Sequence, residues 1–183
     1  MNQVEIYLKQ LQEKINDLKS IEILALFEIL KSALLNNQKI VICGNGGSAS
    51  TGEHFATDLL KSVGLEGKKK INVINLTANS SIFSAFSNDY GYENSFSKQI
   101  QNVGNKGDLL FCISASGNSK NVINAIKVAQ KLEMITVCLV GFDGGFLDKN
   151  CDYSLLIPIN DYGIVEDIHL SICHILARLL SKI

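Results

Sequence analysis

A glycine-rich segment near the start of the chain has the residue types that bind an anion. Residues 39–48 (KIVICGNGGS) begin as an apolar run and end in Gly44, Gly46, Gly47 and Ser48. Backbone amides at the start of a following helix would converge on a phosphate, and Ser48 could both cap that helix and donate to a phosphate oxygen. The spacing matches neither the dinucleotide-binding fingerprint nor the P-loop. Taken alone, an ordinary strand-to-helix turn explains the segment equally well.

A second segment, residues 114–119 (SASGNS), has the same character. It follows a short apolar run at 109–113, which is typical of a buried parallel strand, and precedes a helical pattern at 121–132. Loops at the carboxyl ends of neighbouring parallel strands face the same crevice. The sequence therefore predicts that the two loops hold one phosphorylated ligand from two sides.

A histidine and a carboxylate share one face of the helix that follows the first loop. His54 and Asp58 are four residues apart, so their side chains are neighbours on that helix. Such a pair suits a metal site or general acid–base catalysis. The alternative is that Asp58 is only solvated and that His54 packs against the protein.

The terminal helix carries the remaining histidines, His169 and His174, together with Glu166 and Asp167. The two carboxylates suit a helix N-terminus, and His169 could be a surface or interface residue. Glu166 and His174 would lie roughly 12 Å apart along a continuous helix, too far to share one ion within one copy. Either the helix begins after Glu166, or a site is completed between subunits.

The hydrophobic pattern predicts the elements that position these residues. Residues 1–36 have apolar side chains at helical spacing, with a break near 19–21, and such leading helices would cover a sheet or form an oligomer. The remainder alternates strand-like and helical segments and ends in a helix at 165–183, which predicts an α/β fold with a parallel sheet between helices. We expect a single domain, 1–183, with a core at 37–183. The expected strands are 40–43, 71–76, 109–113, 135–140 and 153–159.

Composition narrows the class of protein. The 183 residues are 46% hydrophobic with a net charge of -1, which gives no basic surface for nucleic acid or an anionic membrane. Arg178 is the only arginine, so hydroxyls, amides and helix dipoles must bind any phosphate. No apolar stretch reaches the ~18 to 20 residues that span a bilayer, so we expect a cytoplasmic protein. Five cysteines without CxxC spacing are interpreted as buried free thiols: Cys43, Cys112, Cys138, Cys151 and Cys173.

With these residues in view, the chain resembles the sugar isomerase (SIS) family and, within it, the phosphoheptose isomerase group. The resemblance covers nearly the whole length. It rests on CGNGGS at 43–48, HFA at 54–56, SNDYGY at 87–92, SASGNS at 114–119, and EDIH at 166–169 with HIL at 174–176. It implies a three-layer, flavodoxin-like fold with a five-stranded parallel sheet and N-terminal oligomerisation helices. It also implies conversion of D-sedoheptulose 7-phosphate to D-glycero-D-manno-heptose 7-phosphate.

The resemblance also implies a set of site residues. Asp58 and His174 would move protons through an enediol, while His54 and Glu166 would chiefly be ligands to a divalent metal, with zinc expected. Asp58 and His174 would complete that metal set. A homotetramer with sites between subunits is implied as well. The expected substrate-binding residues, with Ser48 from the loop chemistry, are Asn45, Gly46, Gly47, Ser48, Asn88, Asp89, Ser114, Ala115, Ser116, Ser119 and Glu166.

Three positions depart from the group's pattern. Asp58 stands where the group has glutamate, Glu166 where it has glutamine, and Ala115 where threonine is common, so Ala115 offers only its backbone. A shorter carboxylate changes reach by ~1.5 Å, which matters for proton transfer, and the added charge of Glu166 would favour a divalent ion. The changes are compatible with a rebuilt metal site or a different sugar phosphate. The other alternative is a non-catalytic phosphosugar-binding regulator, since some relatives contact a replication initiator protein.

Overall fold

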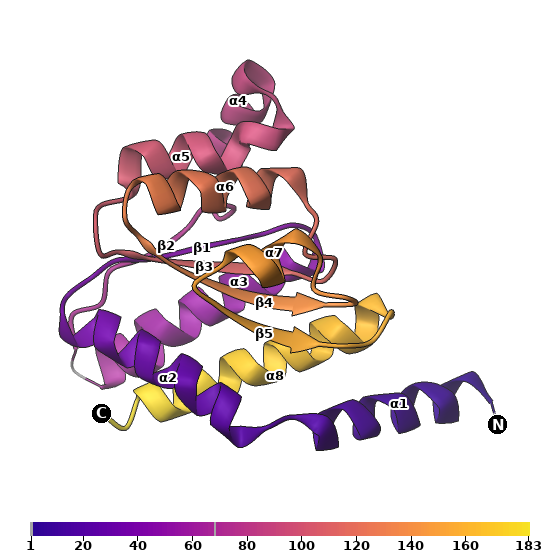
Figure 1. The fold of residues 1–183 in the computed structure, drawn as a ribbon. Coiled ribbons are helices and arrows are strands. Elements are labelled where there is room, and N and C mark those ends of the chain that lie inside the picture. Colours follow the sequence, from indigo (N-terminus) through magenta and orange to yellow (C-terminus); the bar gives the residue numbers. More distant parts are fainter. Residues whose placement is uncertain (1, 68) are drawn as a thin grey trace.

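The computed structural model describes residues 2–67 and 69–183, and in them five parallel strands form one sheet in the order β2-β1-β3-β4-β5 (Figure 1). This order, reversed between β1 and β3, is that of flavodoxin-like folds and confirms the predicted architecture. The strands are β1 (Ile40–Gly44), β2 (Val73–Asn75), β3 (Leu109–Ser114), β4 (Ile135–Gly141) and β5 (Tyr153–Ile157).

Helices cover both faces of the sheet, so the molecule has three layers (Figure 1). One face is covered by α2, α3 and α8, and the other by α5, α6 and the short α7. The helices are α1 (Gln3–Asp17), α2 (Ser20–Leu35), α3 (Gly47–Asp58), α4 (Ser80–Tyr90), α5 (Ser95–Val103), α6 (Lys120–Lys131), α7 (Gly145–Asn150) and α8 (Tyr162–Leu180), with a π-helix η1 (Leu59–Glu66) and a 3-10 turn η2 (Tyr92–Asn94).

The central strands are apolar throughout because both of their faces are buried. On β1, Ile40 and Ile42 pack with α2, α3 and α8, whereas Val41 and Cys43 face the layer of α5 and α6. All four side chains are at most 1% exposed. A continuous apolar run, rather than an alternating one, is typical of such a strand.

Element boundaries differ from the predicted ones where a local constraint acts. The predicted strand 71–76 is reduced to Val73–Asn75, because β2 is an edge strand that pairs only with β1. The last strand ends at Ile157, since Pro158 has no N–H to donate to a ladder. Helix α8 begins at Tyr162 rather than 165, because the Asp161 side chain accepts a hydrogen bond from the Ile164 amide at 3.0 Å.

The cysteine prediction is correct for three residues and wrong for two. Cys43, Cys112 and Cys173 are buried free thiols, but Cys138 and Cys151 form a disulfide. Cys138 lies on β4 and Cys151 directly follows α7, so the short helix brings the two together. A separation of 13 residues across a strand and a helix leaves no spacing signal in the sequence.

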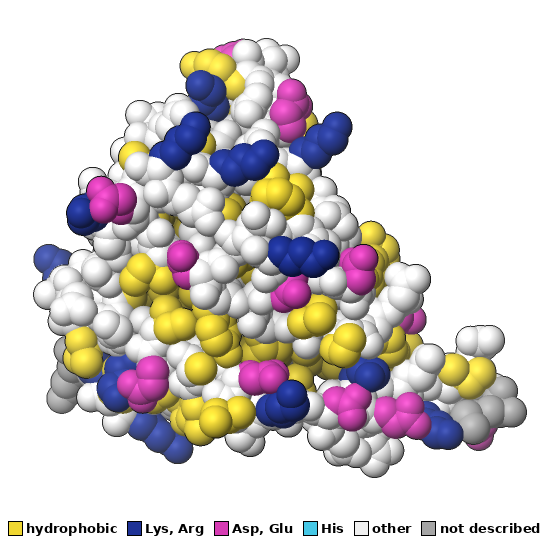
Figure 2. Space-filling view, viewed as in Figure 1, with side chains coloured by type: hydrophobic (Ala, Val, Ile, Leu, Met, Phe, Trp, Pro, Cys, Tyr) yellow, Lys and Arg dark blue, Asp and Glu magenta, His cyan; other side chains and the backbone are white. Residues whose placement is uncertain are grey.

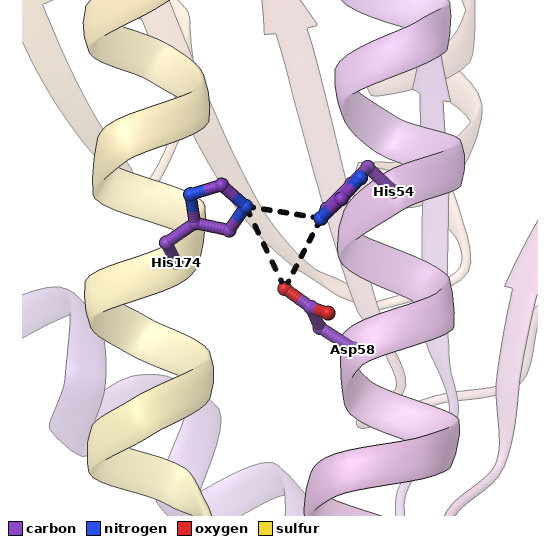
Figure 3. A group of neighbouring side chains, drawn as sticks. All are labelled: His54, Asp58 and His174. Atoms are coloured by element: carbon purple, nitrogen blue, oxygen red, sulfur yellow. Dashed lines mark hydrogen bonds and ion pairs between the residues drawn. The ribbon is translucent and has the colours of Figure 1, made fainter.

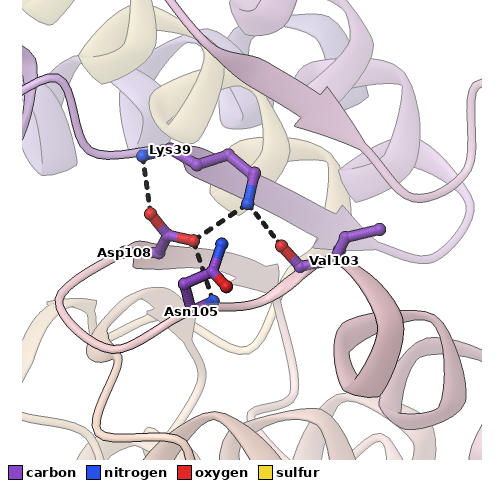
Figure 4. Close-up of polar contacts among 4 residues, drawn as sticks. All are labelled: Lys39, Val103, Asn105 and Asp108. Carbon is purple, nitrogen blue, oxygen red and sulfur yellow. Dashed lines mark hydrogen bonds and ion pairs between the residues drawn. The ribbon is translucent and has the colours of Figure 1, made fainter.

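A partly buried ion pair joins the starts of β1 and β3 (Figure 4). The Asp108 carboxylate accepts hydrogen bonds from the Lys39 amide at 2.8 Å, the Lys39 Nζ at 3.0 Å and the Asn105 amide at 2.9 Å. Lys39 Nζ also donates to the Val103 carbonyl. Burial alone would raise the pKa of Asp108, but these donors and the Lys39 charge outweigh it and hold the pKa below its usual value. The pair supports the register that places Gly44 beside Ile113 at the opposite end of the strands.

Helix α1 extends away from the rest of the chain (Figures 1 and 2). It begins with a complete capping box between Asn2 and Glu5, yet none of residues 3–17 is buried. The Tyr7 and Leu11 side chains pack against the core, and the Tyr7 hydroxyl donates to Asp167 on α8 at 2.6 Å. That hydrogen bond, with partial burial and nearby charge, raises the pKa of Tyr7 to about 12.

Across residues 2–67 and 69–183, no helix combines the length and the apolar content that crossing a membrane requires.

Candidate functional site

The two glycine- and serine-rich loops lie side by side. They follow β1 and β3, which are neighbours in the sheet at the point where the strand order reverses, and this is the usual ligand crevice of such folds. Both loops line one cavity of about 280 Å³, which we call the loop hollow. Its lining residues are Asn45, Gly46, Gly47, Ser48, Ile113, Ser114, Ala115, Ser116, Ser119, Tyr162 and Glu166.

The first loop presents the N-terminus of α3 to this hollow. Gly46 is the N-cap residue and has a φ of +55°, which favours glycine. Ser48 therefore does not cap the helix, contrary to the sequence prediction, and lies buried within its first turn. The first amides of a helix have no partners within it and carry the positive end of its dipole, so they suit an anion.

Asparagine side chains join the two loops. Asn45 and Asn121 exchange two side-chain hydrogen bonds of 2.9 Å, and the Asn121 side-chain oxygen Oδ1 also accepts a hydrogen bond from the Val122 backbone amide. The Tyr92 hydroxyl donates to Asn45 at 2.8 Å. The contact of Asn45 with substrate stays a prediction, and in the structure its side chain links the two loops.

Helix α7 supports the second loop from behind. The Leu147 amide donates to the Gly117 carbonyl at 3.1 Å, and the Phe146 amide donates to the Asn118 side chain at 3.0 Å. Gly117 has a φ of +63°, and a Cβ at this position would overlap the Gly144 carbonyl. Only glycine permits this close approach.

Glu166 reaches into the loop hollow from the first turns of α8. A Cβ on Gly47 would overlap its carboxylate, so this acid lies directly against the start of α3. Burial, and then the charge of Asp167, raise the pKa of Glu166. Helix α8 is continuous from Tyr162 to Leu180, so the eight residues from Glu166 to His174 span about 12 Å. The possibility that the helix begins after Glu166 is thereby excluded.

The second cluster is formed by His54, Asp58 and His174 (Figure 3). The two Nε2 atoms are 3.0 Å apart, and an Asp58 oxygen lies 3.6 Å from that of His54 and 3.9 Å from that of His174. His54 is 52% exposed and Asp58 26%, so the alternative of a packed histidine and a merely solvated carboxylate does not describe them. The three line a cavity of about 420 Å³, which we call the histidine hollow.

The packing of α3 against α8 creates this cluster. His54 and Asp58 come from α3, His174 comes from α8, and the two helices lie next to each other (Figure 3). The α-helix changes to the π-helix η1 directly after Asp58, and η1 contributes Ser62 and Glu66 to the histidine hollow. Short π segments frequently occur at functional sites.

The donor set of the cluster suits a transition metal. One ligand atom from each of His54, Asp58 and His174 lies within 4.8 Å of the others, and two imidazole nitrogens with one carboxylate oxygen are ligands that zinc accepts. Among the described residues, Glu166 does not belong to this group. Its predicted role as a fourth ligand would require a second copy of the chain.

Asn88 and Asp89 lie in the last turn of α4, which stands away from the sheet (Figure 1). The Asn88 side-chain nitrogen donates to the Asp89 carboxylate at 2.9 Å. Neither is among the described residues that line the loop hollow or the histidine hollow. The same segment reaches the site through Tyr92 instead.

His169 is fully buried, which excludes the alternative that it is a surface or interface residue. Its Nε2 lies 3.2 Å from the Val140 carbonyl on β4. Nδ1 has no hydrogen-bond partner in the part of the chain that the structure describes. Burial lowers the pKa of His169 to about 4, so the ring is neutral and acts as a structural link between α8 and β4.

Sequence reasoning missed several residues that line or support the two hollows. Asn121 follows the predicted second loop and Tyr162 precedes the predicted terminal helix. Their positions were therefore only a weak indication that they belong to the site. Arg178 lines the histidine hollow one helical turn after His174, a position that the helical spacing alone could have indicated. Tyr92 bonds Asn45 across 47 residues of sequence, which no local pattern reveals.

Comparison with known proteins places these features in context. Residues 5–141 match the family model described as SIS domain. A phosphoheptose isomerase of Helicobacter pylori is 42% identical over 84% of this chain and 80% of its own, and one of Geotalea daltonii is 39% identical over 95% and 90%. The structure of a phosphoheptose isomerase from Neisseria gonorrhoeae superposes with a TM-score of 0.91 at 30% identity, covering 98% of this chain and 97% of its own.

The close packing of Gly117 against Gly144 leads to a prediction about phosphate binding. We predict that Gly117→Ala weakens the binding of inorganic phosphate by about tenfold, because the methyl group displaces the loop from α7 and disfavours the positive φ. Isothermal titration calorimetry measures the binding. Gly64→Ala is the control, since its Cβ would meet its nearest neighbour at an ordinary 3.4 Å. Unchanged phosphate binding in a folded Gly117→Ala protein would exclude this loop from the anion site.

Proposed function

Because the chain belongs to the SIS domain family and, within it, to the phosphoheptose isomerases, we propose that it interconverts D-sedoheptulose 7-phosphate and D-glycero-D-manno-heptose 7-phosphate. One observation carries the proposal for this chain's own residues. The loop hollow and the histidine hollow lie along the same two adjacent helices, α3 and α8. The loop hollow offers the amides and hydroxyls that bind a phosphate, and the histidine hollow offers the imidazoles and carboxylate that transfer protons.

The spacing of the two hollows supports a long sugar phosphate. Seven residues of α3 separate Gly47 from His54, which corresponds to about 10 Å. On α8, Glu166 and His174 are about 12 Å apart. A sugar whose phosphate occupies the loops must extend along both helices before its carbonyl end reaches the histidines. A seven-carbon chain suits that distance better than a triose.

The loops would hold the phosphate without a cation of their own. Amides at the start of α3 and the serine hydroxyls of residues 114–119 supply donors, and none of the described residues lining the loop hollow is Lys or Arg. Glu166 would face the substrate with a carboxyl group whose pKa is raised by burial and by the charge of Asp167.

His54, Asp58 and His174 would hold a divalent metal, for which we propose zinc because two imidazoles and a carboxylate fit it. When bound, such an ion polarises a carbonyl and the adjacent hydroxyl. Asp58 would move the proton between C1 and C2 through an enediol. His174 would transfer the second proton between the oxygens on C1 and C2. Although aspartate is shorter than glutamate, an Asp58 oxygen lies within 4 Å of both imidazoles. This distance supports its proposed role as a metal ligand beside the two histidines.

The activity is tested by turnover and metal content together. We expect the wild-type protein to contain about one zinc per chain and to isomerise sedoheptulose 7-phosphate, observed by NMR. Asp58→Asn should lower kcat by about a thousandfold, because it removes both the proposed base and one proposed metal ligand, and should leave phosphate binding unchanged. Asp17→Asn, on the exposed end of α1, is the matched control.

Three other outcomes decide between the alternatives. Metal without heptose turnover would indicate another sugar phosphate as the substrate. Neither metal nor turnover, with phosphosugar binding retained, would indicate a regulatory binder. Full activity of Asp58→Asn would remove this residue from the mechanism.

We also propose a homotetramer that operates in the cytoplasm. Val4, Leu8 and Ile15 on α1 are 67%, 58% and 46% exposed in one chain, which leaves an apolar surface to be covered. The Tyr7–Asp167 hydrogen bond places α1 beside the residue that follows Glu166, so an interface on α1 would lie near the site. The buried free thiols are typical of a reducing compartment, whereas the Cys138–Cys151 disulfide is not.

This assembly is tested by a charge on α1. We predict that Leu8→Glu converts a tetramer into smaller species, because a carboxylate would be buried in the interface without a partner. Gln10→Glu, which adds the same charge at an exposed polar position of α1, should remain tetrameric. Sedimentation equilibrium measures the mass, and an unaltered mass for Leu8→Glu would argue against an interface on this face.

A further inference from the structure

An aromatic ring lines the loop hollow. Tyr162, the first residue of α8, is 60% exposed and lines the hollow together with Ser119 and Glu166. Ligand sites combine aromatic side chains with a few polar groups, and the faces of sugars carry C–H groups that pack on such rings. We propose that the Tyr162 ring packs against the carbons of the sugar phosphate that lie next to the phosphate group, and that it is a specificity-determining residue of the site. The inference rests on the proposed function and deepens it.

The ring is held in place rather than left free. Phe142 packs edge-to-face against it, with ring centroids 4.7 Å apart and planes at 74°. The Asp161 side chain caps α8 through the Ile164 amide and so fixes the backbone on either side of Tyr162. An exposed aromatic side chain that is already positioned loses little conformational freedom when a ligand binds.

The residue that holds the ring has an unfavourable backbone conformation. Phe142 has a φ of +55°, which is rare for a bulky side chain, and such strain concentrates at functional sites. Its neighbour Gly141 donates to the Ala115 carbonyl at 2.9 Å, and Phe142 itself donates to the Ile159 carbonyl at 3.3 Å. Phe142 therefore connects the second phosphate loop to Tyr162. A glycine would adopt this conformation without strain but would leave the ring unsupported.

Different groups in the loop hollow would recognise the phosphate group and the carbon chain of the ligand. Phosphate recognition comes from backbone amides and serine hydroxyls, to which an uncharged phenol ring adds little. The carbon chain offers C–H groups and hydroxyls, and of the described lining residues Tyr162 is the one with an aromatic face. Loss of the ring should therefore weaken binding of the sugar phosphate and spare binding of phosphate itself.

The test compares two ligands by isothermal titration calorimetry on the full chain. For Tyr162→Ala we expect the Kd of sedoheptulose 7-phosphate to rise about tenfold, while the Kd of inorganic phosphate changes less than twofold. Tyr162→Phe, which keeps the ring, should bind both ligands as the wild type does. Phe142→Leu should show the Tyr162→Ala pattern in weaker form. Ile21→Ala, which truncates a 74% exposed side chain on α2, controls for loss of apolar surface.

Turnover separates this inference from the proposed function. In an active enzyme, Tyr162→Ala should raise KM for sedoheptulose 7-phosphate and leave kcat nearly unchanged. If the wild type binds the sugar phosphate without turning it over, the proposed activity is wrong and the calorimetric comparison still decides the role of the ring. An unchanged Kd for the sugar phosphate in Tyr162→Ala, or an equal rise for both ligands, would overturn the inference.

Discussion

The site depends on the side-by-side packing of α3 and α8. Both helices begin at the loop hollow, α3 at Gly47 and α8 at Tyr162, and they run together to the histidine hollow. Because a helix rises 1.5 Å per residue, the numbers of residues between their functional side chains set the distance between the two chemistries. His169 supports this arrangement, since its buried neutral ring contacts the Val140 carbonyl on β4 and ties α8 to the sheet.

A consequence of this arrangement is an anion site built almost entirely from uncharged groups. The strand order brings the ends of β1 and β3 together, the Asn45–Asn121 hydrogen bonds join their loops, and α7 supports the second loop from behind. Into this site the chain places Glu166, an acid, directly against the start of α3. A carboxylate and a phosphate in one hollow repel each other, and burial together with the charge of Asp167 already raises the pKa of Glu166.

The sequence predicted the parts that local pattern determines. Continuous apolar runs gave the five parallel strands, and the i, i+4 spacing of His54 and Asp58 gave one face of α3. What it could not predict depends on contacts between distant segments. The approach of His174 to His54 to 3.0 Å depends on how α8 packs on α3, and the separation of Glu166 from that cluster depends on α8 being unbroken. The Cys138–Cys151 disulfide and the Tyr92–Asn45 hydrogen bond were missed for the same reason.

The central claim is that one sugar phosphate extends from the loops to the histidines along α3 and α8. A crystal structure of the protein with zinc and a non-isomerisable analogue of sedoheptulose 7-phosphate tests it most directly. The account predicts the phosphate between residues 45–48 and 114–119, and the C1–C2 end of the sugar beside His54 and His174. A phosphate bound beside Arg178, or a sugar whose reactive end points away from the histidines, would contradict it.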